Sequence, residues 1–286
     1  MNRMARSMIQ QLIAARAEKE LKRRLSNLHS TPIVKIPKVP DDFEAFNRMI
    51  GLPISSDMGK PSEILSYQVD IDTAINKKHR VIINKSRKIG VTETVLRSIA
   101  KNCFFRYAEY NVMIVAGNRQ SQAQDALTRL DNLFERGFTD LNGVYFSYHE
   151  IIKKKTKSSM EFFNGTKITI YPPDAKAVRG PARVACVLLD EAAHIKHIDD
   201  AKVYDALRPN LANTNGDFII VSTPNGSRGI FYDLWMQEKG PYHKMELPYT
   251  LALGGLLSED YINQERENGT DFEQEYDCKF TTTKQS

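Results

Sequence analysis

The 286-residue chain has little of several residue types that mark specialised protein classes. It contains only three cysteines, Cys103, Cys186 and Cys278, and they lie far apart. Such spacing gives neither a disulfide framework nor a zinc knuckle. No stretch approaches the roughly 18 consecutive apolar residues of a membrane span, and the N-terminus lacks the apolar core of a signal peptide. These absences favour a reducing, intracellular setting and predict no membrane partner.

The charge balance is also far from extreme. Forty Lys and Arg residues against 35 Asp and Glu residues give a net charge of +5. This mild excess is compatible with a polyanionic partner without requiring one. The hydrophobic share of 41% and charged share of 26% are those of an ordinary globular protein, so composition alone predicts a soluble intracellular protein and nothing more specific.

The first 60 residues differ in pattern from the rest. Residues 1 to about 28 have apolar side chains at helical spacing among several lysines and arginines, and they predict a basic helix. Pro32, Pro37 and Pro40 then predict an extended connector. The basic helix either packs loosely on the rest of the protein with its charges in solvent, or contacts DNA or a neighbouring subunit. We expect residues 1–60 to form this helix and connector.

Residues 61–280 predict one α/β domain, and residues 281–286 a short tail. Short apolar runs of strand type alternate with helical stretches, a pattern typical of a mostly parallel central sheet flanked by helices. The runs are at 81–83, 112–115, 185–189 and 218–221, with helices expected at 92–107 and 119–136. Asn164-Gly165 between two alternating segments also predicts an inserted β-hairpin.

The segment after the first predicted strand has the features of a phosphate-binding loop. Such a loop presents backbone N–H groups, a lysine and a metal-binding hydroxyl at the start of a helix. Gly90 and Thr92 occupy the expected positions, but Val91 stands where the usual lysine belongs. Lys85, at the front of the loop, is the best candidate for the missing charge, and Arg87 is a candidate γ-phosphate clamp. The alternative is a solvated basic loop.

Two acids follow the third predicted strand. Asp190 and Glu191 end the apolar run 185–189, and the carboxyl ends of strands form the ligand-binding edge of an open α/β sheet. Phosphoryl transfer to water needs one carboxylate to hold a metal ion and another to orient or deprotonate the water. Asp190 suits the first role and Glu191 the second. The alternative is an acidic helix N-cap.

A polar segment also follows the fourth predicted strand. Ser222, Thr223 and Pro224 come at its carboxyl end. In motor ATPases, polar residues at this edge lie near the γ-phosphate and couple hydrolysis to movement. The alternative is a turn, because Thr-Pro-Asn-Gly is also ordinary turn chemistry.

These elements together resemble the ATPase domain of the phage terminase large subunit, a P-loop NTPase of the ASCE class. The match covers about 62 to 280, and its order and spacing are more specific than any single motif. Tyr67 and Gln68 are similar to the adenine-reading Q motif, and Ser222-Thr223-Pro224 is similar to the coupling motif. The family often has a deviant Walker A loop with its lysine at the front. Here that loop consists of Lys85, Ser86, Arg87, Lys88, Ile89, Gly90, Val91 and Thr92, and it departs at Lys88, where Gln is common.

The resemblance implies an ATP-hydrolysing motor of viral double-stranded DNA packaging. ATP and Mg²⁺ are the implied cofactors, with Thr92 and Asp190 on the metal and Glu191, Arg87 and Lys85 in catalysis. The implied partners are double-stranded DNA, a portal protein, a small terminase subunit and further copies in a ring, commonly a pentamer, in the host cell cytoplasm. The nuclease domain that normally follows is expected to be absent, or on another chain.

Two other functions stay open. One is a different ASCE ATPase that remodels nucleic acid, and the other is a non-hydrolysing nucleotide- or DNA-binding subunit.

Two further groups have weaker signals. Lys153, Lys154 and Lys155 are possible DNA contacts, although a charge run is more often a solvated face. His194 and His197 lack a defined third ligand for zinc and are expected to be surface or capping histidines.

Overall fold

The computed structural model describes residues 35–53, 62–117, 120–195, 199–269 and 271–281, together with Glu18. By its contacts the chain divides into two units, Met1–Lys35 and Ile36–Ser286. The predicted N-terminal helix thus lies outside the described residues, apart from Glu18. Helix α2 (Phe43–Ile50) belongs to the second unit, where it packs against α3 and α4, although it lies within the predicted 1–60 segment.

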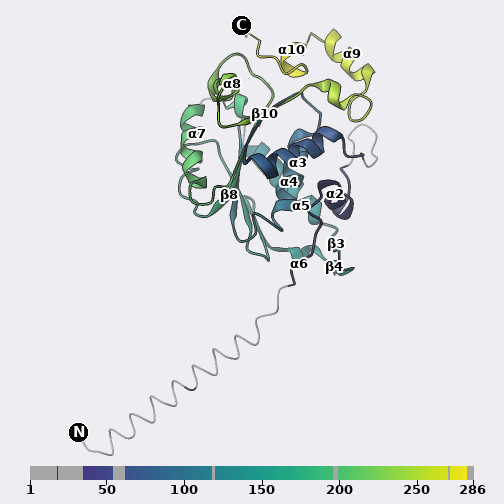
Figure 1. Ribbon diagram of the computed structural model, residues 1–286, viewed down its shortest axis with the longest axis vertical. Coiled ribbons are helices and arrows are strands. Elements are labelled where there is room, and N and C mark those ends of the chain that lie inside the picture. Colours follow the sequence, from purple (N-terminus) through teal and green to yellow (C-terminus); the bar gives the residue numbers. More distant parts are fainter. Residues whose placement is uncertain are drawn as a thin grey trace, which may run out of the picture. The chain divides into compact units, whose positions relative to one another are not determined.

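An eight-stranded sheet forms the centre of the second unit (Figure 1). Its order is β10-β1-β9-β8-β2-β7-β6-β5; the strands from β10 to β7 are parallel, and β6 and β5 continue the sheet antiparallel. The bounds are β1 Arg80–Lys85, β2 Asn111–Ala116, β5 Ile152–Lys155, β6 Ser159–Phe162, β7 Lys167–Tyr171, β8 Val184–Asp190, β9 Asp217–Ser222 and β10 His243–Leu247.

The predicted α/β architecture is confirmed. All four predicted strands lie inside observed ones, because apolar side chains on both faces of β1, β2, β8 and β9 are covered. The predicted hairpin is β6–β7, with Gly165 at a positive φ of 86° in its turn. It extends the main sheet and is not a separate insertion, because β7 also pairs with β2.

Helices cover both faces of the sheet (Figure 1). On one face lie α3 (Ser66–Lys78), α4 (Val91–Asn102) and α5 (Gln120–Phe134), and on the other lie α7 (Asp200–Leu207) and α8 (Gly229–Met236). Successive residues of β1 alternate between two apolar clusters: Val81 and Ile83 face one, and Ile82 faces the other. None of the described helices is both long and apolar enough to span a bilayer.

Smaller elements complete the unit. They are β3 (Phe138–Thr139) and β4 (Tyr145–Phe146), α6 (Tyr148–Ile151), the 3₁₀ turns η1 (Ala192–His194), η2 (Arg208–Leu211) and η3 (Tyr249–Ala252), and the C-terminal α9 (Glu259–Glu267) and α10 (Phe272–Glu275).

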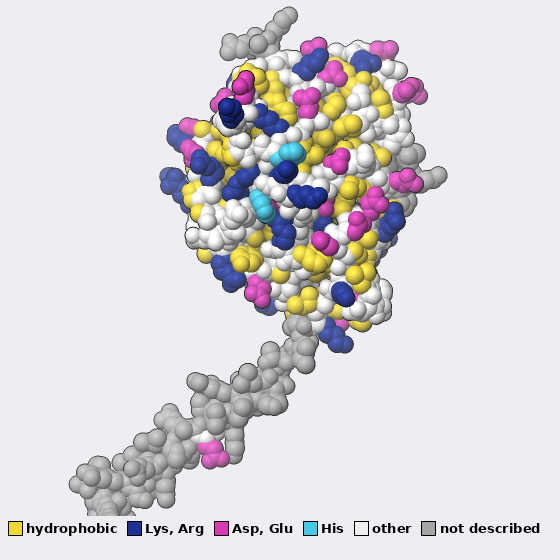
Figure 2. All heavy atoms as spheres, in the orientation of Figure 1, with side chains coloured by type: hydrophobic (Ala, Val, Ile, Leu, Met, Phe, Trp, Pro, Cys, Tyr) yellow, Lys and Arg dark blue, Asp and Glu magenta, His cyan; other side chains and the backbone are white. Residues whose placement is uncertain are grey.

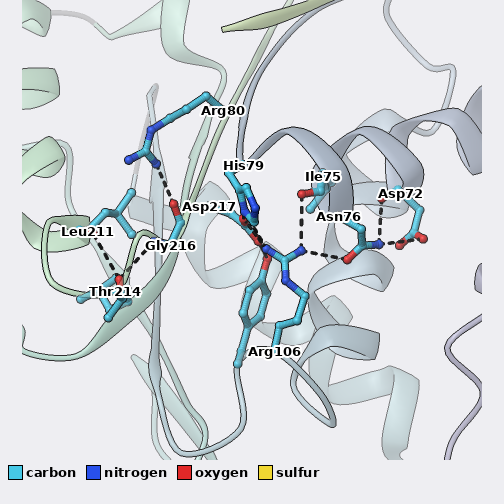
Figure 3. Close-up of polar contacts among 12 residues, drawn as sticks. Asp72, Ile75, Asn76, His79, Arg80, Arg106, Leu211, Thr214, Gly216 and Asp217 are labelled. Atoms are coloured by element: carbon cyan, nitrogen blue, oxygen red, sulfur yellow. Dashed lines mark hydrogen bonds and ion pairs between the residues drawn. The ribbon is translucent and has the colours of Figure 1, made fainter. Parts of the chain in front are cut away.

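An ion pair around a buried carboxylate joins the amino end of strand β9 to the neighbouring helices (Figure 3). Asp217, at the start of β9, has no exposed surface; it accepts hydrogen bonds from Arg106 Nη2 at 2.6 Å and from the Tyr107 hydroxyl at 2.5 Å. His79 Nδ1 is 2.8 Å from the same carboxylate. Arg106 also donates to Asn76, so the pair ties β9 to α3 and to the turn after α4.

Replacing Arg106 with methionine is expected to lower the free energy of unfolding by about 3 kcal/mol, because it removes the arginine that pairs with a fully buried carboxylate and leaves that carboxylate beside His79 and Tyr107. Urea denaturation measures the loss. Arg48→Met is the matched control: Arg48 pairs with Glu44 at 3.2 Å, but its side chain is 72% exposed, so a change within about 0.5 kcal/mol is expected. Equal losses in the two variants would contradict the stabilising role of the buried pair.

Candidate functional site

The neighbouring strands β1, β9 and β8 end on the same side of the sheet, and predicted site residues lie at the end of each. The strand order places β9 between β1 and β8. The loop 86–90 follows β1, the polar segment 222–224 begins at the last residue of β9, and Asp190 is the last residue of β8. Since parallel strands present their carboxyl ends on the same side, segments about 100 residues apart in the sequence meet in one site.

The loop after β1 is fixed from outside by the C-terminal part of the chain. The backbone N–H groups of Ser86 and Arg87 donate to the carbonyls of Leu247 and Glu275, at 2.8 and 2.9 Å. Gly90 has a φ of 74° immediately before α4, and a Cβ there would lie 3.2 Å from the Leu256 side chain. A side chain at this position would therefore be strained, which favours glycine. The first N–H groups of α4 have no partner within the helix, as in helix N-termini that bind anions.

Lys85 reaches the centre of the site. Its side chain is only 8% exposed, and Nζ donates to Glu191 Oε1 at 2.8 Å. Arg87 points elsewhere: its side chain is 60% exposed, and Nε lies 3.2 Å from Glu275 Oε2. Lys85 thus lies beside Glu191 inside the site, whereas Arg87 is paired with Glu275 at its exposed side.

The two predicted metal ligands lie together. Thr92 Oγ1 is 3.2 and 3.3 Å from the two carboxylate oxygens of Asp190. Burial, reinforced by the neighbouring charge of Glu191, raises the pKa of Asp190 to about 6. A hydroxyl and a carboxylate are the hard oxygen donors that Mg²⁺ prefers, and a buried carboxylate close to a second one gains from a bound cation. The donor set therefore fits magnesium.

Glu191 is held in an unusual backbone conformation beside these groups. Its φ of 51° places it in the left-handed region, directly after β8. Burial alone would raise its pKa, but the charge and hydrogen bond of Lys85 outweigh burial, and the pKa of Glu191 is lowered. The contact with Lys85 therefore favours the ionised form of Glu191.

The segment after β9 contacts both sides of the site. Ser222 Oγ accepts a hydrogen bond from the backbone of Ala193 at 3.1 Å, and Thr223 Oγ1 lies 2.9 Å from His194 Nε2. Further along, Gly226 N donates to Gln274 at 2.8 Å. The polar segment therefore links the residues after Glu191 to the C-terminal helices.

His194 lies in the site, where the sequence interpretation had not placed it. Its Nε2 is 3.9 Å from Glu191 Oε2, and its side chain is 21% exposed. The 3₁₀ turn η1 brings it back toward Glu191, and the Glu-Ala-Ala-His spacing was the available signal. Within the described residues, no group of three or more His, Cys, Asp and Glu side chains could hold a metal ion; His197 lies outside them.

A cavity of about 540 Å³ lies along the loop, a volume that suits a small-molecule ligand. Gln68 lines it together with Lys85, Gly90 and Thr92, as do residues that the sequence analysis had not singled out: Pro53, Arg97, Arg129 and Leu256. Tyr67 is not among the lining residues. It is buried, and its hydroxyl donates to the Ile89 carbonyl at 2.5 Å, so it supports the loop from behind.

A second cavity, of about 410 Å³, lies where the loop faces the C-terminal helices. Lys85, Arg87 and Glu191 line it from the loop side, and Tyr261 and Tyr276 line it from the C-terminal side. Lys88, also at a positive φ, has its ammonium 4.6 Å from the centre of the Tyr261 ring. The C-terminal residues belong to the surroundings of the loop, although no pattern in that segment indicated it.

The lysine run lies away from this site. Lys153, Lys154 and Lys155 are in β5, the edge strand farthest from β10 in the sheet order. Lys153 pairs with Glu161 at 2.6 Å, and Lys155 pairs with Asp131. Lysines on an edge strand also discourage unwanted strand pairing, so their contact with DNA stays a prediction.

Comparison with known proteins agrees with this geometry. The family model for the terminase large subunit, T4likevirus-type, N-terminal, matches residues 82–286. No curated protein sequence matches the chain.

Solved structures show the same fold. The Thermus phage P74-26 large terminase ATPase domain has a TM-score of 0.51 at 17% identity, covering 74% of this chain and 93% of that one. The HK97 bacteriophage large terminase has a TM-score of 0.63 at 15% identity, covering 82% of this chain and 53% of that one. The large terminase of a thermophilic bacteriophage, in complex with ADP, gives a TM-score of 0.58 at 13% identity, covering 76% and 53%. The fold is thus shared with these terminase structures, and the chain spans about half the length of the latter two proteins.

Proposed function

The chain belongs to the terminase large-subunit family, and we propose that it is the ATP-hydrolysing motor that drives double-stranded DNA into a viral procapsid. One observation carries the proposal. The Lys85–Glu191 contact and the Thr92–Asp190 contact stand side by side at the carboxyl ends of β1 and β8. That set supplies the phosphate-binding, metal-binding and water-activating groups needed for hydrolysis.

In this mechanism Lys85 moves from Glu191 to the phosphates of ATP. The N–H groups at the start of α4 and the Arg87 guanidinium hold the same phosphates, and Gln68 recognises adenine from the 540 Å³ cavity. Thr92 and Asp190 would hold Mg²⁺, which neutralises phosphate charge when bound. Glu191, released from Lys85, orients the water and accepts its proton.

The segment 222–224 is proposed to couple hydrolysis to movement. Ser222 Oγ lies 3.5 Å from Glu191 Oε2, and Gly226 is bonded to the C-terminal segment through Gln274. A change at Glu191 can therefore reach the C-terminal helices through the hydrogen bond to Ser222, the backbone from 222 to 226, and the hydrogen bond to Gln274.

The proposed setting is the cytoplasm of an infected host cell. The partners are double-stranded DNA, a portal protein, a small terminase subunit and a homo-oligomeric ring, with a pentamer the expected form. The nuclease activity of the packaging machine is assigned to another domain or chain.

The same site admits the two rival functions, which are a different nucleic-acid remodelling ATPase and a non-hydrolysing subunit. Directional translocation separates them from a packaging motor. With portal-bearing procapsids and linear duplex, we expect ATP-dependent protection of the DNA from nuclease. ATP turnover without protection would favour the remodeller.

Removing the Thr92 hydroxyl tests the metal assignment. Thr92→Val, which keeps the shape of the side chain, is expected to raise the Mg²⁺ concentration needed for half-maximal turnover, or to lower turnover, by on the order of 10–100-fold. Thr92→Ser keeps the hydroxyl and is expected to stay near the wild type. A magnesium titration of ATP hydrolysis compares the three proteins, and identical curves would remove Thr92 from the ligand set.

A further inference from the structure

Basic side chains gather where the strands of the sheet begin. This is the end of the sheet opposite the nucleotide site, which lies where the strands finish. Lys77 and Lys78 end α3, and Arg80 begins β1 two residues later. Strand β10 lies beside β1, with His243 opposite Val81 and Lys244 opposite Ile82. Figure 2 shows lysine, arginine and two histidine side chains grouped on this view of the molecule, between the regions where Figure 1 places α7 and α3.

Arg208 extends the group toward α7. It begins η2, and it lines a hollow of about 750 Å³ together with Arg80. Tyr204 and Tyr242 form part of the wall, and the Arg208 guanidinium lies 5.5 Å from the centre of the Tyr204 ring. The two arginines therefore stand on one concave surface.

Backbone carbonyl groups, which are neutral, hold two of these cations in place. Arg80 Nη1 donates to the Gly216 carbonyl at 2.7 Å (Figure 3), and Lys244 Nζ donates to the Gln237 carbonyl at 2.6 Å. A backbone carbonyl orients a charged side chain without cancelling its charge. These two side chains thus keep their full positive charge while their conformations are restricted.

The acids near this edge do not balance the cations. Asp217 is fully buried, and Arg106 already neutralises it. Asp205 lies 3.5 Å from Arg208, but both side chains are more than half exposed, so the pair contributes little. In the described part of the chain, neither Lys77 nor Lys78 has a carboxylate within salt-bridge distance.

We propose that this surface binds the phosphate backbone of double-stranded DNA. The name amino-edge surface is used for its five cations, Lys77, Lys78, Arg80, Arg208 and Lys244. The choice of DNA as the polyanion rests on the proposed function. No base-reading arrangement is needed, because contacts to phosphates are independent of sequence.

The position of the surface relates it to the nucleotide site. Arg80 and Lys85 are the two ends of β1, so their Cα atoms lie about 17 Å apart along one strand. DNA would contact the amino ends of the strands whose carboxyl ends hold the reacting groups.

Fluorescence anisotropy with a fluorescein-labelled duplex of about 30 base pairs, between about 50 and 200 mM salt, tests the proposal. The test variant is Lys77→Gln, Lys78→Gln, Arg208→Gln and Lys244→Gln together, with Arg80 retained because it is bonded to Gly216. The slope of log affinity against log salt is negative, and each lost phosphate contact reduces its magnitude by about 0.9. We expect this magnitude to fall by up to about 3.6, with affinity at about 150 mM salt at least about tenfold weaker.

The control removes an equal number of positive charges from the lysine run around β5, through Lys153→Gln, Lys154→Gln, Lys155→Gln and Lys157→Gln. Because Lys153 and Lys155 are already paired with Glu161 and Asp131, its slope is expected to change much less than that of the amino-edge variant. Thermal unfolding midpoints check that both variants are folded. A loss confined to the control, or equal in the two variants, would overturn the amino-edge surface while leaving DNA as a partner. A wild-type chain that does not bind the duplex at about 50 mM salt would contradict both this surface and the DNA part of the proposed function; ATP hydrolysis would still be measured separately.

Discussion

Changing Glu191 to glutamine is expected to lower ATP turnover by on the order of 10²–10⁴ while leaving nucleotide binding intact. The glutamine amide keeps an oxygen that can accept the Lys85 hydrogen bond, so the loop and cavity should keep their shape. It cannot take a proton from water, and this loss falls on the chemical step alone. Phosphate release at saturating Mg·ATP measures the first effect, and titration with a fluorescent ATP analogue measures the second.

Glu161→Gln is the control for the Glu191 variant. Glu161 is in β6 and pairs with Lys153, away from the site, so its replacement should leave turnover unchanged. If Glu191→Gln kept turnover within about tenfold of the wild type, another residue would have to activate the water.

Changing Lys85 to alanine is expected to lower kcat/KM for ATP by at least about 10²-fold and to weaken nucleotide binding as well. Lys85 is a buried cation between the loop and Glu191. Without it the phosphates lose a counter-charge, and the buried Asp190 and half-buried Glu191 become neighbouring carboxylates without a neutralising lysine. Lys85→Arg should restore little, because a planar guanidinium does not fit the place of a compact ammonium.

Lys88→Ala provides the comparison for Lys85. Lys88 is in the same loop, but its ammonium lies over the Tyr261 ring and is not bonded to Glu191. We expect its loss to reduce kcat/KM by less than about tenfold. Steady-state kinetics compare the fall in kcat/KM of the Lys85 and Lys88 variants. A larger fall for Lys88→Ala would mean that the loop uses Lys88, and not Lys85, to bind the phosphates.

The fold and the centre of the site could be predicted from the sequence because both depend on local patterns. Apolar runs buried on both faces predict central strands, and the residues after them must meet at one edge. The lysine at the front of the loop was also predictable. Val91 is 1% exposed and packs in the core, so that position does not suit a charged side chain.

Other parts of the fold and of the site depended on packing between distant segments, and little or nothing in the local sequence indicated them. Strand β10 has no continuous apolar run, since four of its five residues are exposed or half-buried at the sheet edge. The contacts of Tyr261, Tyr276 and Glu275 with the loop arise only when the C-terminal helices dock. The position of His194 depended on the backbone turn at Glu191, which the residue types do not reveal.

The most direct test of the central claim is Mg²⁺-dependent ATP hydrolysis by the unmodified chain, measured by phosphate release over a range of protein concentrations, with and without double-stranded DNA. We expect hydrolysis that requires Mg²⁺, with a turnover per subunit that rises with protein concentration as subunits assemble. No phosphate release at any concentration, with nucleotide shown to be bound, would contradict hydrolysis and favour the non-hydrolysing subunit.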